Sequence, residues 1–332
     1  MEQRLWMILQ LFGGAALFLY SMDTLTDALQ QAAGDTLRQA LARLTAHPLA
    51  GVLTGAAVTA VVQSSSAVTV LVLGLVGAGL LTLQRAVPVV FGANIGTTVT
   101  AQLLAFRLED ARYLLLVAGL LLWFAGRGRL HAAGQALFAF GLLFEGIAVM
   151  AEAMEPLAAG PVFRQWMAQV RHRPGLGLLA GLGMTLAVQS SSATIAVLQQ
   201  MAARPGPDGG CLLGLAGAIP VLLGDNIGTT VTAVLASVGQ SRDAKRLAAA
   251  HALFNLSGAA MCWLLLPQFT ALVRLVSPHG PESAVLARQI ANAHTLFNLG
   301  CTVLWLPLTP CMVRIVCILL PEKHAPELKR TP

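Results

Sequence analysis

The chain has 332 residues, of which 56% are hydrophobic and 11% are charged, and its formal net charge at pH 7 is +6. Soluble domains carry about 25% charged residues, so this composition excludes an ordinary soluble protein and indicates that lipid solvates much of the chain. The positive charge is mostly Arg scattered between apolar segments, with only three lysines, at Lys245, Lys323 and Lys329. This pattern is typical of loops, and nucleic acid is not expected as a partner.

The spacing of the cysteines argues against a metal site, and the absence of catalytic motifs argues against an enzyme. The number of cysteines is odd, and no pair has metal-ligand spacing. The five are Cys211, Cys262, Cys301, Cys311 and Cys317. The sequence also has no Ser-His-Asp set and no phosphate-binding loop, so we expect neither enzymatic activity nor a cofactor.

In chain order, the first apolar segment is residues 5–31, which is long enough to span a membrane. Residues 13–22 resemble residues 141–150 at the same spacing, which favours a structural segment over a cleaved signal peptide. Residues 34–47 alternate apolar and charged positions at helical spacing. They predict an amphipathic helix at the membrane surface, which Pro48 ends.

Residues 49–84 are apolar except for Gln-Ser-Ser-Ser at residues 63–66, the first serine turn. The flanks of this turn are each shorter than the roughly 20 residues that a full crossing needs. We therefore predict a re-entrant helical hairpin with the serines at its tip. Its non-helical backbone would be covered by protein or by a watery cavity.

Residues 86–106 form the next predicted span and contain Gly-Ala-Asn-Ile-Gly-Thr-Thr-Val-Thr-Ala at residues 92–101, the first Asn-Thr run. Two glycines beside an Asn and two Thr predict a locally unwound, broken helix. A short span at residues 111–125 and a further span at residues 130–152 follow.

The second half repeats this plan. A polar connector at residues 153–173 leads to a second hairpin at residues 175–203, which contains Gln-Ser-Ser-Ser again at residues 189–192, the second serine turn. A second broken span at residues 212–238 carries the matching motif. A final span at residues 289–320 and a short polar tail follow.

The sequence thus predicts an all-α polytopic membrane protein with two repeats, residues 1–128 and 129–268, and a C-terminal span and tail at residues 269–332. A re-entrant hairpin does not change sides, so each half makes three crossings and the second half enters from the opposite face. This is an inverted-topology repeat, which is common among secondary transporters. Arg and Lys are nearly balanced between the two sides, so they do not orient the chain.

Two hairpins that enter from opposite faces would bring their tips together near the midplane. The helix that starts after each serine turn points its positive end at the tip, which suits an anion, while carbonyls and hydroxyls there suit sodium. No Lys or Arg lies in the repeated motifs, so bound cations would have to balance an anion. The alternative for a single copy is close packing or hydrogen bonding to the preceding turn, but two matched copies favour a site.

The two serine turns, each followed by Gly-x-Asn-Ile-Gly-Thr-Thr, resemble the type II sodium-dependent phosphate cotransporters and their bacterial relatives. Residues 250–255 and 293–298, each with a His-x-x-Phe-Asn pattern, also resemble this family, and the likeness covers nearly the whole chain. It implies sodium-coupled phosphate transport and a joint phosphate and sodium site. The implied site residues are Gln63, Ser64, Ser65, Ser66, Gln189, Ser190, Ser191, Ser192, Asn94, Thr97, Thr98, Asn226, Thr229 and Thr230.

Two carboxylates are further candidates for a cation or coupling site. Asp225 stands where the first Asn-Thr run has Ala93, and it could bind sodium, tune the number of coupled ions, sense protons, or simply lie at a membrane boundary. Glu145 lies inside a predicted span, which makes it a functional candidate by default. Its alternative is a role at a subunit contact or in a water-filled crevice.

We therefore predict a carrier of the bacterial inner membrane that moves phosphate inward with sodium, by alternating access around the two hairpin tips. The alternatives are export of phosphate or carriage of another oxyanion on the same fold, and then a channel or a non-transporting scaffold. The expected partners are inorganic phosphate, sodium, membrane lipid and a second copy of the chain in a homodimer.

Overall fold

The computed structural model describes residues 2–33, 47–105, 112–206 and 210–322. Every regular element in these residues is a helix, which confirms the all-α class. The fourteen helices are α1 (Glu2–Ala33), α3 (Pro48–Val62), α4 (Ser65–Gly77), α5 (Leu83–Leu104), α6 (Arg112–Ala125), α7 (Arg129–Ala159), α8 (Pro161–His172), α9 (Pro174–Val188), α10 (Ser191–Ala202), α11 (Gly214–Ala236), α12 (Arg242–Leu264), α13 (Leu266–Leu275), α14 (Glu282–Trp305) and α15 (Thr309–Leu319).

Five of these helices contain segments long and apolar enough to cross a membrane, and the bent pair α14 and α15 makes a sixth. The segments are Leu5–Leu25, Leu83–Leu104, Arg129–Met150, Gly214–Ala236 and Arg242–Leu264. The prediction of a polytopic membrane protein is therefore confirmed. The segment predicted as a short span forms α6, whose 14 residues are too few to cross alone at about 1.5 Å per residue.

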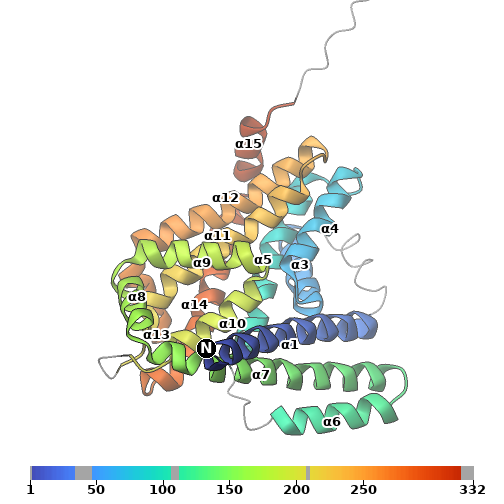
Figure 1. The fold of residues 1–332 in the computed structure, drawn as a ribbon. Coiled ribbons are helices and arrows are strands. Elements are labelled where there is room, and N and C mark those ends of the chain that lie inside the picture. The colour runs from blue at the N-terminus through green and yellow to red at the C-terminus, as the bar shows by residue number, and fades with distance from the viewer. Residues whose placement is uncertain (1, 34–46, 106–111, 207–209, 323–332) are drawn as a thin grey trace, which may run out of the picture.

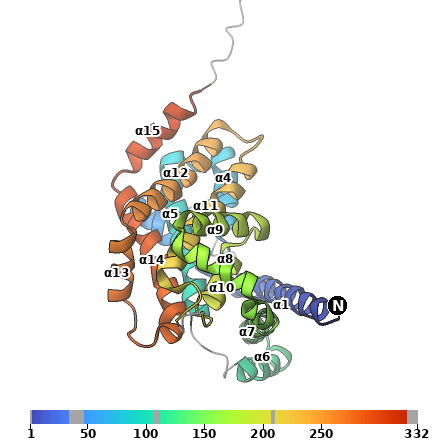
Figure 2. The ribbon, with the colours of Figure 1, turned by 60° about the vertical axis from the view of Figure 1, so that its left-hand side comes forward.

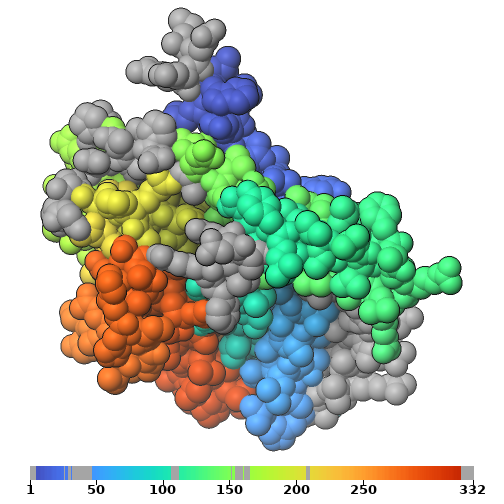
Figure 3. All heavy atoms as spheres, turned by 90° about the horizontal axis from the view of Figure 1, so that it is seen from below, coloured from blue at the N-terminus to red at the C-terminus, as the bar shows by residue number. Residues whose placement is uncertain are grey.

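Helices α1, α7 and α6 lie side by side at one edge of the molecule (Figure 1). Small residues bring α1 and α7 close together, because a Cβ on Gly14 would come within 2.9 Å of the carbonyl oxygen of Gly146. The two segments that resemble each other in sequence are thus neighbours in space. Viewed from below, α6 forms part of the outer rim (Figure 3), and of its residues only Gly119 is buried.

Helices α5 and α11 form the centre of the molecule. Their most apolar windows are 78% and 72% buried, against 22% for Leu5–Leu25. Each packs tightly on the first helix of its own hairpin, α5 on α3 and α11 on α9. A Cβ on Gly92 would collide with the carbonyl oxygen of Val52. A Cβ on Gly224 would likewise collide with the carbonyl oxygen of Leu178, so both pairs touch backbone to backbone.

This packing corrects the prediction that residues 86–106 and 212–238 hold locally unwound helices. Both α5 and α11 are continuous helices through their Asn-Thr runs. The glycines serve close helix contact, as at Gly92, and the polar side chains bond within their own helix. Thr98, for example, donates to the carbonyl oxygen of Ile95 at 2.7 Å. Even Pro88 and Pro220 lie inside these helices without ending them.

Two other predicted segments take a different form in the structure. The predicted final span at residues 289–320 is not one continuous helix. It is formed by α14 and α15, which meet at 85°. Pro310 in the first turn of α15 supplies a physical reason for a new start there. The polar connector at residues 153–173 is also helical, formed by the end of α7 and by α8. The predicted surface helix at 34–47 lies outside the described residues, except for His47, which caps α3.

The second helix of each hairpin contacts both halves. Helix α4 packs on α5 of its own half and also contacts α11 and α12 of the second half, beside which it lies in Figure 2. Helix α10 packs on α11 of its own half and also contacts α5 of the first half and α14. Each hairpin therefore joins the two halves through its second helix.

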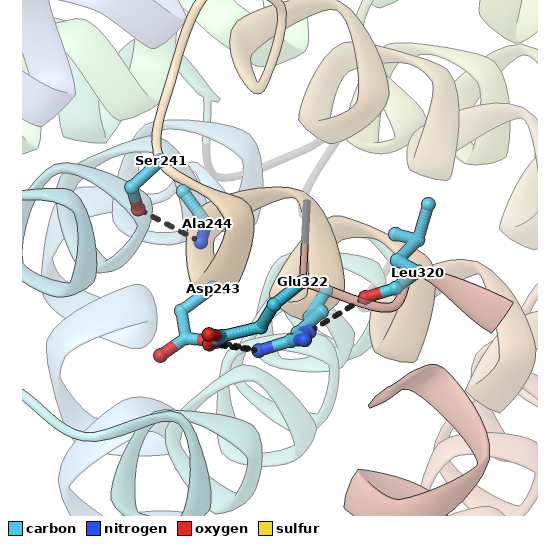
Figure 4. A network of polar contacts seen from close by, with 6 residues as sticks. Ser241, Asp243, Ala244, Leu320 and Glu322 are labelled. Atoms are coloured by element: carbon cyan, nitrogen blue, oxygen red, sulfur yellow. Dashed lines mark hydrogen bonds and ion pairs between the residues drawn. The ribbon is translucent and has the colours of Figure 1, made fainter. Parts of the chain in front are cut away.

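The far end of the chain is tied to the start of α12 (Figure 4). Arg246 donates from Nε to the carbonyl oxygen of Leu320 at 2.9 Å and pairs with Asp243 at 2.7 Å and Glu322 at 3.6 Å. Ser241 caps the same helix by accepting a hydrogen bond from the amide of Ala244 at 3.3 Å. The buried guanidinium thus holds α15 against the body of the protein.

Candidate functional site

Each predicted hairpin is two short helices separated by a glutamine in a left-handed backbone conformation. Gln63 ends α3 with φ 57° and ψ 18°, and Gln189 ends α9 with φ 56° and ψ 22°. Among the described residues these are the only two non-glycine positions with positive φ. Because this conformation is unfavourable for residues with a Cβ, its recurrence at matched positions indicates that the glutamine side chain itself is needed.

The glutamine side chains close each turn in the same way. The Gln63 amide nitrogen donates to the carbonyl oxygen of Ala60, and its amide oxygen accepts from the Thr100 hydroxyl on α5. The Gln189 amide nitrogen donates to the carbonyl oxygen of Leu186 at 2.8 Å, and its amide oxygen accepts from the Thr232 hydroxyl at 3.0 Å. Each serine turn is therefore fastened to the Asn-Thr run of its own half.

The first serine of each turn caps the second helix of the hairpin. The Ser64 hydroxyl accepts from the amide of Ala67 at 3.1 Å, and the Ser190 hydroxyl accepts from the amide of Ala193 at 3.3 Å. These two serines are the N-caps of α4 and α10, where Ser is a preferred residue. Their hydroxyl oxygens already accept a hydrogen bond from the helix backbone and are therefore less available to a ligand.

The other serine hydroxyls have no such partner. In the part of the chain that the structure describes, no hydrogen bond satisfies the hydroxyl groups of four residues in the first turns of α4 and α10. They are Ser65, Ser66, Ser191 and Ser192. These hydroxyls lie at the positive ends of the two helices, where they could donate to an anion or give lone pairs to a cation.

The Asn-Thr runs supply polar groups that are already bonded within helices. Each threonine hydroxyl donates its hydrogen, and each asparagine donates one amide hydrogen, to a carbonyl oxygen of its own helix, so the hydroxyl oxygens can act toward a ligand only as acceptors. The residues concerned are Asn94, Thr97, Thr98, Asn226, Thr229 and Thr230. Such oxygens suit a cation better than an oxyanion.

The asparagines of the two runs contact the two helices that carry the His-x-x-Phe-Asn pattern. Asn94 Oδ1 lies 3.3 Å from His251 Nε2 on α12, and Asn226 Oδ1 accepts from Asn298 Nδ2 on α14 at 3.4 Å. Phe91 also stacks on Phe254 with ring centroids 4.7 Å apart. The sequence pattern identified these helices but did not show that the side chain of His251 reaches the asparagine of the first run and that of Asn298 the asparagine of the second.

Asp225 lies on α11 and is fully buried where α11 packs against α9. It is 0% exposed, and its Oδ1 accepts from the Thr185 hydroxyl at 2.6 Å. Its Oδ2 is buried without a hydrogen-bond partner. The structure therefore places this carboxylate in the interior of the protein.

Glu145 lies on α7, where this helix contacts α6. Its carboxylate is 3.1 Å from Arg112 Nε, across the contact between α7 and α6, and both side chains are partly exposed. No hydrogen bond or ion pair joins it to either serine turn within the described residues. The ion pair explains why a carboxylate is tolerated inside this segment, because buried charges are paired.

The two serine turns are not joined by a hydrogen bond. Among the residues described, none links residues 63–66 to residues 189–192, and the helices that follow the turns, α4 and α10, each contact the opposite half. The described residues also hold no group of three His, Cys, Asp or Glu side chains that could bind a metal. A cation at these turns would be held mainly by neutral oxygens.

Comparison with known proteins adds a family and several relatives. The profile of the Na+/Pi-cotransporter family matches the chain twice, over residues 17–152 and 145–276, and each match holds one serine turn and one Asn-Thr run. "Uncharacterized protein YqeW" of Bacillus subtilis (strain 168) is 34% identical over 306 residues, which cover 92% of this chain and 96% of that protein.

Two further relatives carry more specific names. "Putative inorganic phosphate export protein YjbB" of Escherichia coli (strain K12) is 26% identical over 254 residues, 76% of this chain and 46% of that protein, so the chain matches about half of its length. "Sodium-dependent phosphate transport protein 2A" of Oryctolagus cuniculus is 41% identical over 93 residues, 27% of this chain and 14% of that protein. No solved structure matches the chain.

Proposed function

The chain belongs to the Na+/Pi-cotransporter family, a family of membrane transporters and not of enzymes, and from this premise we propose that it carries inorganic phosphate across the cell membrane by symport with sodium. Membership supports phosphate transport, and the apolar helices agree with a multi-pass protein of the cell membrane. The coupling to sodium, the inward direction and the site at the serine turns are the parts that we propose.

One observation supports the site above all others. Four serine hydroxyls that have no hydrogen-bond partner among the described residues lie at the N-terminal ends of α4 and α10, in two turns of the same geometry. Phosphate oxygens accept hydrogen bonds, and helix N-terminal ends favour negative charge. We propose that Ser65, Ser66, Ser191 and Ser192 donate to phosphate, while Gln63 and Gln189 hold the turns in place.

Sodium coupling follows from the charge of these motifs. No Lys or Arg lies in either serine turn or either Asn-Thr run, so an anion there has no fixed cation beside it. Sodium ions bound to hydroxyl, amide and carbonyl oxygens would balance it. The lone pairs of Asn94 and Asn226, with those of the Thr side chains in the same runs, are the ligands that we propose. Such a cycle needs no organic cofactor.

We further propose that residues 1–128 and 129–268 act as two inverted repeats, with residues 269–332 as a C-terminal addition. The contacts of α4 with α11 and α12, and of α10 with α5, support this arrangement, because each hairpin then contacts both repeats. Alternating access would expose the serine turns to one side of the membrane and then to the other.

The test is uptake of radiolabelled phosphate into proteoliposomes that contain the purified chain. We expect uptake to require an inward sodium gradient and to fall at least tenfold when Ser65 and Ser191 are both replaced by Ala, since the two lost interactions together contribute about 1.4 kcal/mol or more. Replacement of Ser283 in the exposed first turn of α14 is the matched control and should leave uptake unchanged. Uptake that is equal in sodium and potassium would contradict symport.

Export of phosphate is the second candidate. The observation that favours it is the match over 76% of this chain to a relative whose name is that of a phosphate export protein. Vesicles of defined orientation separate the two directions, because an exporter would release preloaded phosphate under a cellular sodium gradient and an importer would accumulate it. Competition by arsenate and sulfate in the same assay tests the choice of oxyanion.

A further inference from the structure

A cavity of about 450 Å³ lies where the turn after α13 meets the first turns of α14. Its lining includes four polar side chains, those of Arg274 at the end of α13, His279 in the turn, and Glu282 and Gln289 on α14. Pockets that hold small ligands have volumes of about 300–1,000 Å³. Apart from Arg274, the lining lies beyond residue 276, where the second family match ends. The repeated motifs therefore do not account for this cavity.

Gln289 supplies the first indication of a ligand. This residue is buried, with 8% of its surface exposed, and its side-chain amide makes no hydrogen bond with a described residue. An amide that is buried without partners is unfavourable, because it has lost its hydrogen bonds to water. Since Gln289 lines the cavity, a ligand there could accept from its nitrogen or donate to its oxygen.

Arg274 and Glu282 give the cavity two opposite charges that do not pair with each other. No ion pair joins them, and within the described part of the chain the Arg274 guanidinium makes no hydrogen bond. Glu282 Oε1 accepts from the amide of Leu215 at 3.4 Å, and its Oε2 has no partner among the described residues. A purely anionic ligand would be repelled by Glu282, and a purely cationic one by Arg274. A ligand that carries both charges would suit both residues.

His279 adds a polar group whose orientation is fixed by the turn. Its Nδ1 lies 3.1 Å from the carbonyl oxygen of Ser277. Because a carbonyl oxygen only accepts, Nδ1 carries a hydrogen and donates it, which leaves Nε2 as the ring nitrogen that can bond a ligand. The Ser277 hydroxyl accepts in turn from Asn292 Nδ2 at 2.9 Å, so the turn is tied to α14.

An apolar surface lies next to Arg274. At the end of α13, Leu272, Leu275 and Val276 are 44%, 74% and 51% exposed, at spacings that place them on one side of the helix. This helix lies at the outer edge of the molecule (Figure 2). The next helix, α14, forms a candidate membrane span together with α15, so the cavity lies at one end of a span. Exposed apolar side chains at this place suit the acyl chains of a lipid.

We propose that the cavity binds the headgroup of a zwitterionic phospholipid that carries an ammonium group. The phosphate would accept hydrogen bonds from the amide of Gln289 and from Arg274, whose guanidinium can hold two phosphate oxygens at once. The ammonium group would donate to Glu282 and to Nε2 of the neutral His279 ring, and the acyl chains would lie along the exposed end of α13. Because Glu282 also bonds the start of α11, the bound lipid would connect α13, α14 and α11.

The test is native mass spectrometry of the purified, delipidated chain with three probes. Phosphatidylethanolamine has both charges, phosphatidylglycerol has the phosphate without the amine, and glycerophosphoethanolamine is the headgroup without acyl chains. We expect phosphatidylethanolamine to bind about tenfold more tightly than phosphatidylglycerol, because only its ammonium group can pair with Glu282. Without acyl chains to cover the end of α13, glycerophosphoethanolamine should bind at least about tenfold more weakly than the lipid.

Two substitutions test the role of each charge. Arg274→Gln should weaken the binding of both phospholipids by about tenfold, since both present a phosphate. Glu282→Gln keeps an oxygen that can accept from the Leu215 amide, so it should spare phosphatidylglycerol and remove the preference for phosphatidylethanolamine. Arg314→Gln and Glu152→Gln, at exposed positions on α15 and α7 outside the cavity, are the matched controls and should bind both lipids as the wild type does.

Equal binding of the two phospholipids by the wild type overturns the proposal, and this comparison needs no variant to fold. A preference that survives in Glu282→Gln also overturns it, because the ammonium group then binds elsewhere. If glycerophosphoethanolamine binds as tightly as the lipid, the cavity takes a soluble zwitterion and the lipid is the wrong ligand. These measurements involve no transport, so their result is independent of the phosphate uptake assay.

Discussion

At the scale of single residues, Gln63 and Gln189 show how function and stability share one position. The left-handed backbone favours Gly, but only a long amide side chain can bond its own helix and also reach Thr100 or Thr232. The sequence showed that both glutamines were repeated. It did not show the left-handed backbone or the threonine partners, because these depend on how α3 and α9 pack beside α5 and α11.

Substitutions at Gln63 should separate these two contributions. Gln63→Gly and Gln63→Val both lose the hydrogen bonds, but only Val has a branched Cβ in the left-handed region. We expect Gln63→Val to be less stable than Gln63→Gly by about 1–2 kcal/mol. Unfolding in a detergent titration measures the difference, and equal stability would show that the turn relaxes to another backbone conformation.

Substitutions at the neighbouring serines Ser64 and Ser65 should separate an effect on stability from an effect on transport. The Ser64 hydroxyl caps α4, so Ser64→Ala should lower the free energy of unfolding by about 1 kcal/mol. The Ser65 hydroxyl has no partner in the described structure, so Ser65→Ala should leave stability within about 0.5 kcal/mol of the wild type while it weakens phosphate transport. Thermal unfolding and uptake, measured on the same preparations, check both expectations. A Ser65→Ala variant with full uptake would remove this hydroxyl from the proposed site.

At the scale of elements, the glycines of α5 and α11 explain why sequence reasoning failed for the broken spans. The breaks between short helices at the serine turns could be predicted because short apolar flanks surround a polar turn, which is a local property, while re-entry into the membrane stays a prediction. In the Asn-Thr runs the same residue types suggested unwinding. Their glycines are instead required by a neighbouring backbone, which no local pattern reveals. The bend between α14 and α15 could have been inferred from Pro307 and Pro310.

Alanine at these glycines should therefore be far more harmful than alanine at glycines with free space. A Cβ at Gly92 or Gly224 collides with a backbone carbonyl that cannot move alone. We expect either substitution to destabilise by about 3 kcal/mol or more, at the upper end of overpacking effects. Gly74 and Gly183 lie inside α4 and α9 with nothing within 4 Å of an added Cβ. Alanine there should be neutral or stabilising by about 0.5–1 kcal/mol.

The measurement is the yield and thermal unfolding temperature of each purified variant. Gly74→Ala and Gly183→Ala are the controls, because they make the same chemical change in neighbouring helices, α4 beside α5 and α9 beside α11. If Gly92→Ala unfolds at the same temperature as Gly74→Ala, the close contact between α5 and α3 does not exist in solution.

At the scale of the whole molecule, the contacts that each hairpin makes with both halves link the halves to each other. Besides its own half, α4 contacts α11 and α12, and α10 contacts α5 and α14. The repeated motifs could be recognised in the sequence, since they recur in order. These contacts between the halves could not be predicted, because they pair segments that are distant in the chain.

A split chain tests this dependence. The connection between α6 and α7 runs through Arg127 and Gly128, and Gly128 has a positive φ of 56° in an exposed turn. We expect residues 1–127 and 128–332, expressed as separate chains, to copurify and to transport phosphate when both are present. Each fragment alone should be degraded. A stable single fragment would show that the contacts of α4 and α10 with the opposite half are not needed for folding.

The glycine contacts also decide where the molecule can deform. Where α3 meets α5 and α9 meets α11, the two backbones touch directly, without a layer of side chains between them, so we expect each pair to move as one rigid unit. Rotation of one helix against the other within a pair would break its closest contacts. The movement that transports phosphate is therefore expected between these two pairs and the group formed by α1, α7 and α6, at the interface of α1 with α3.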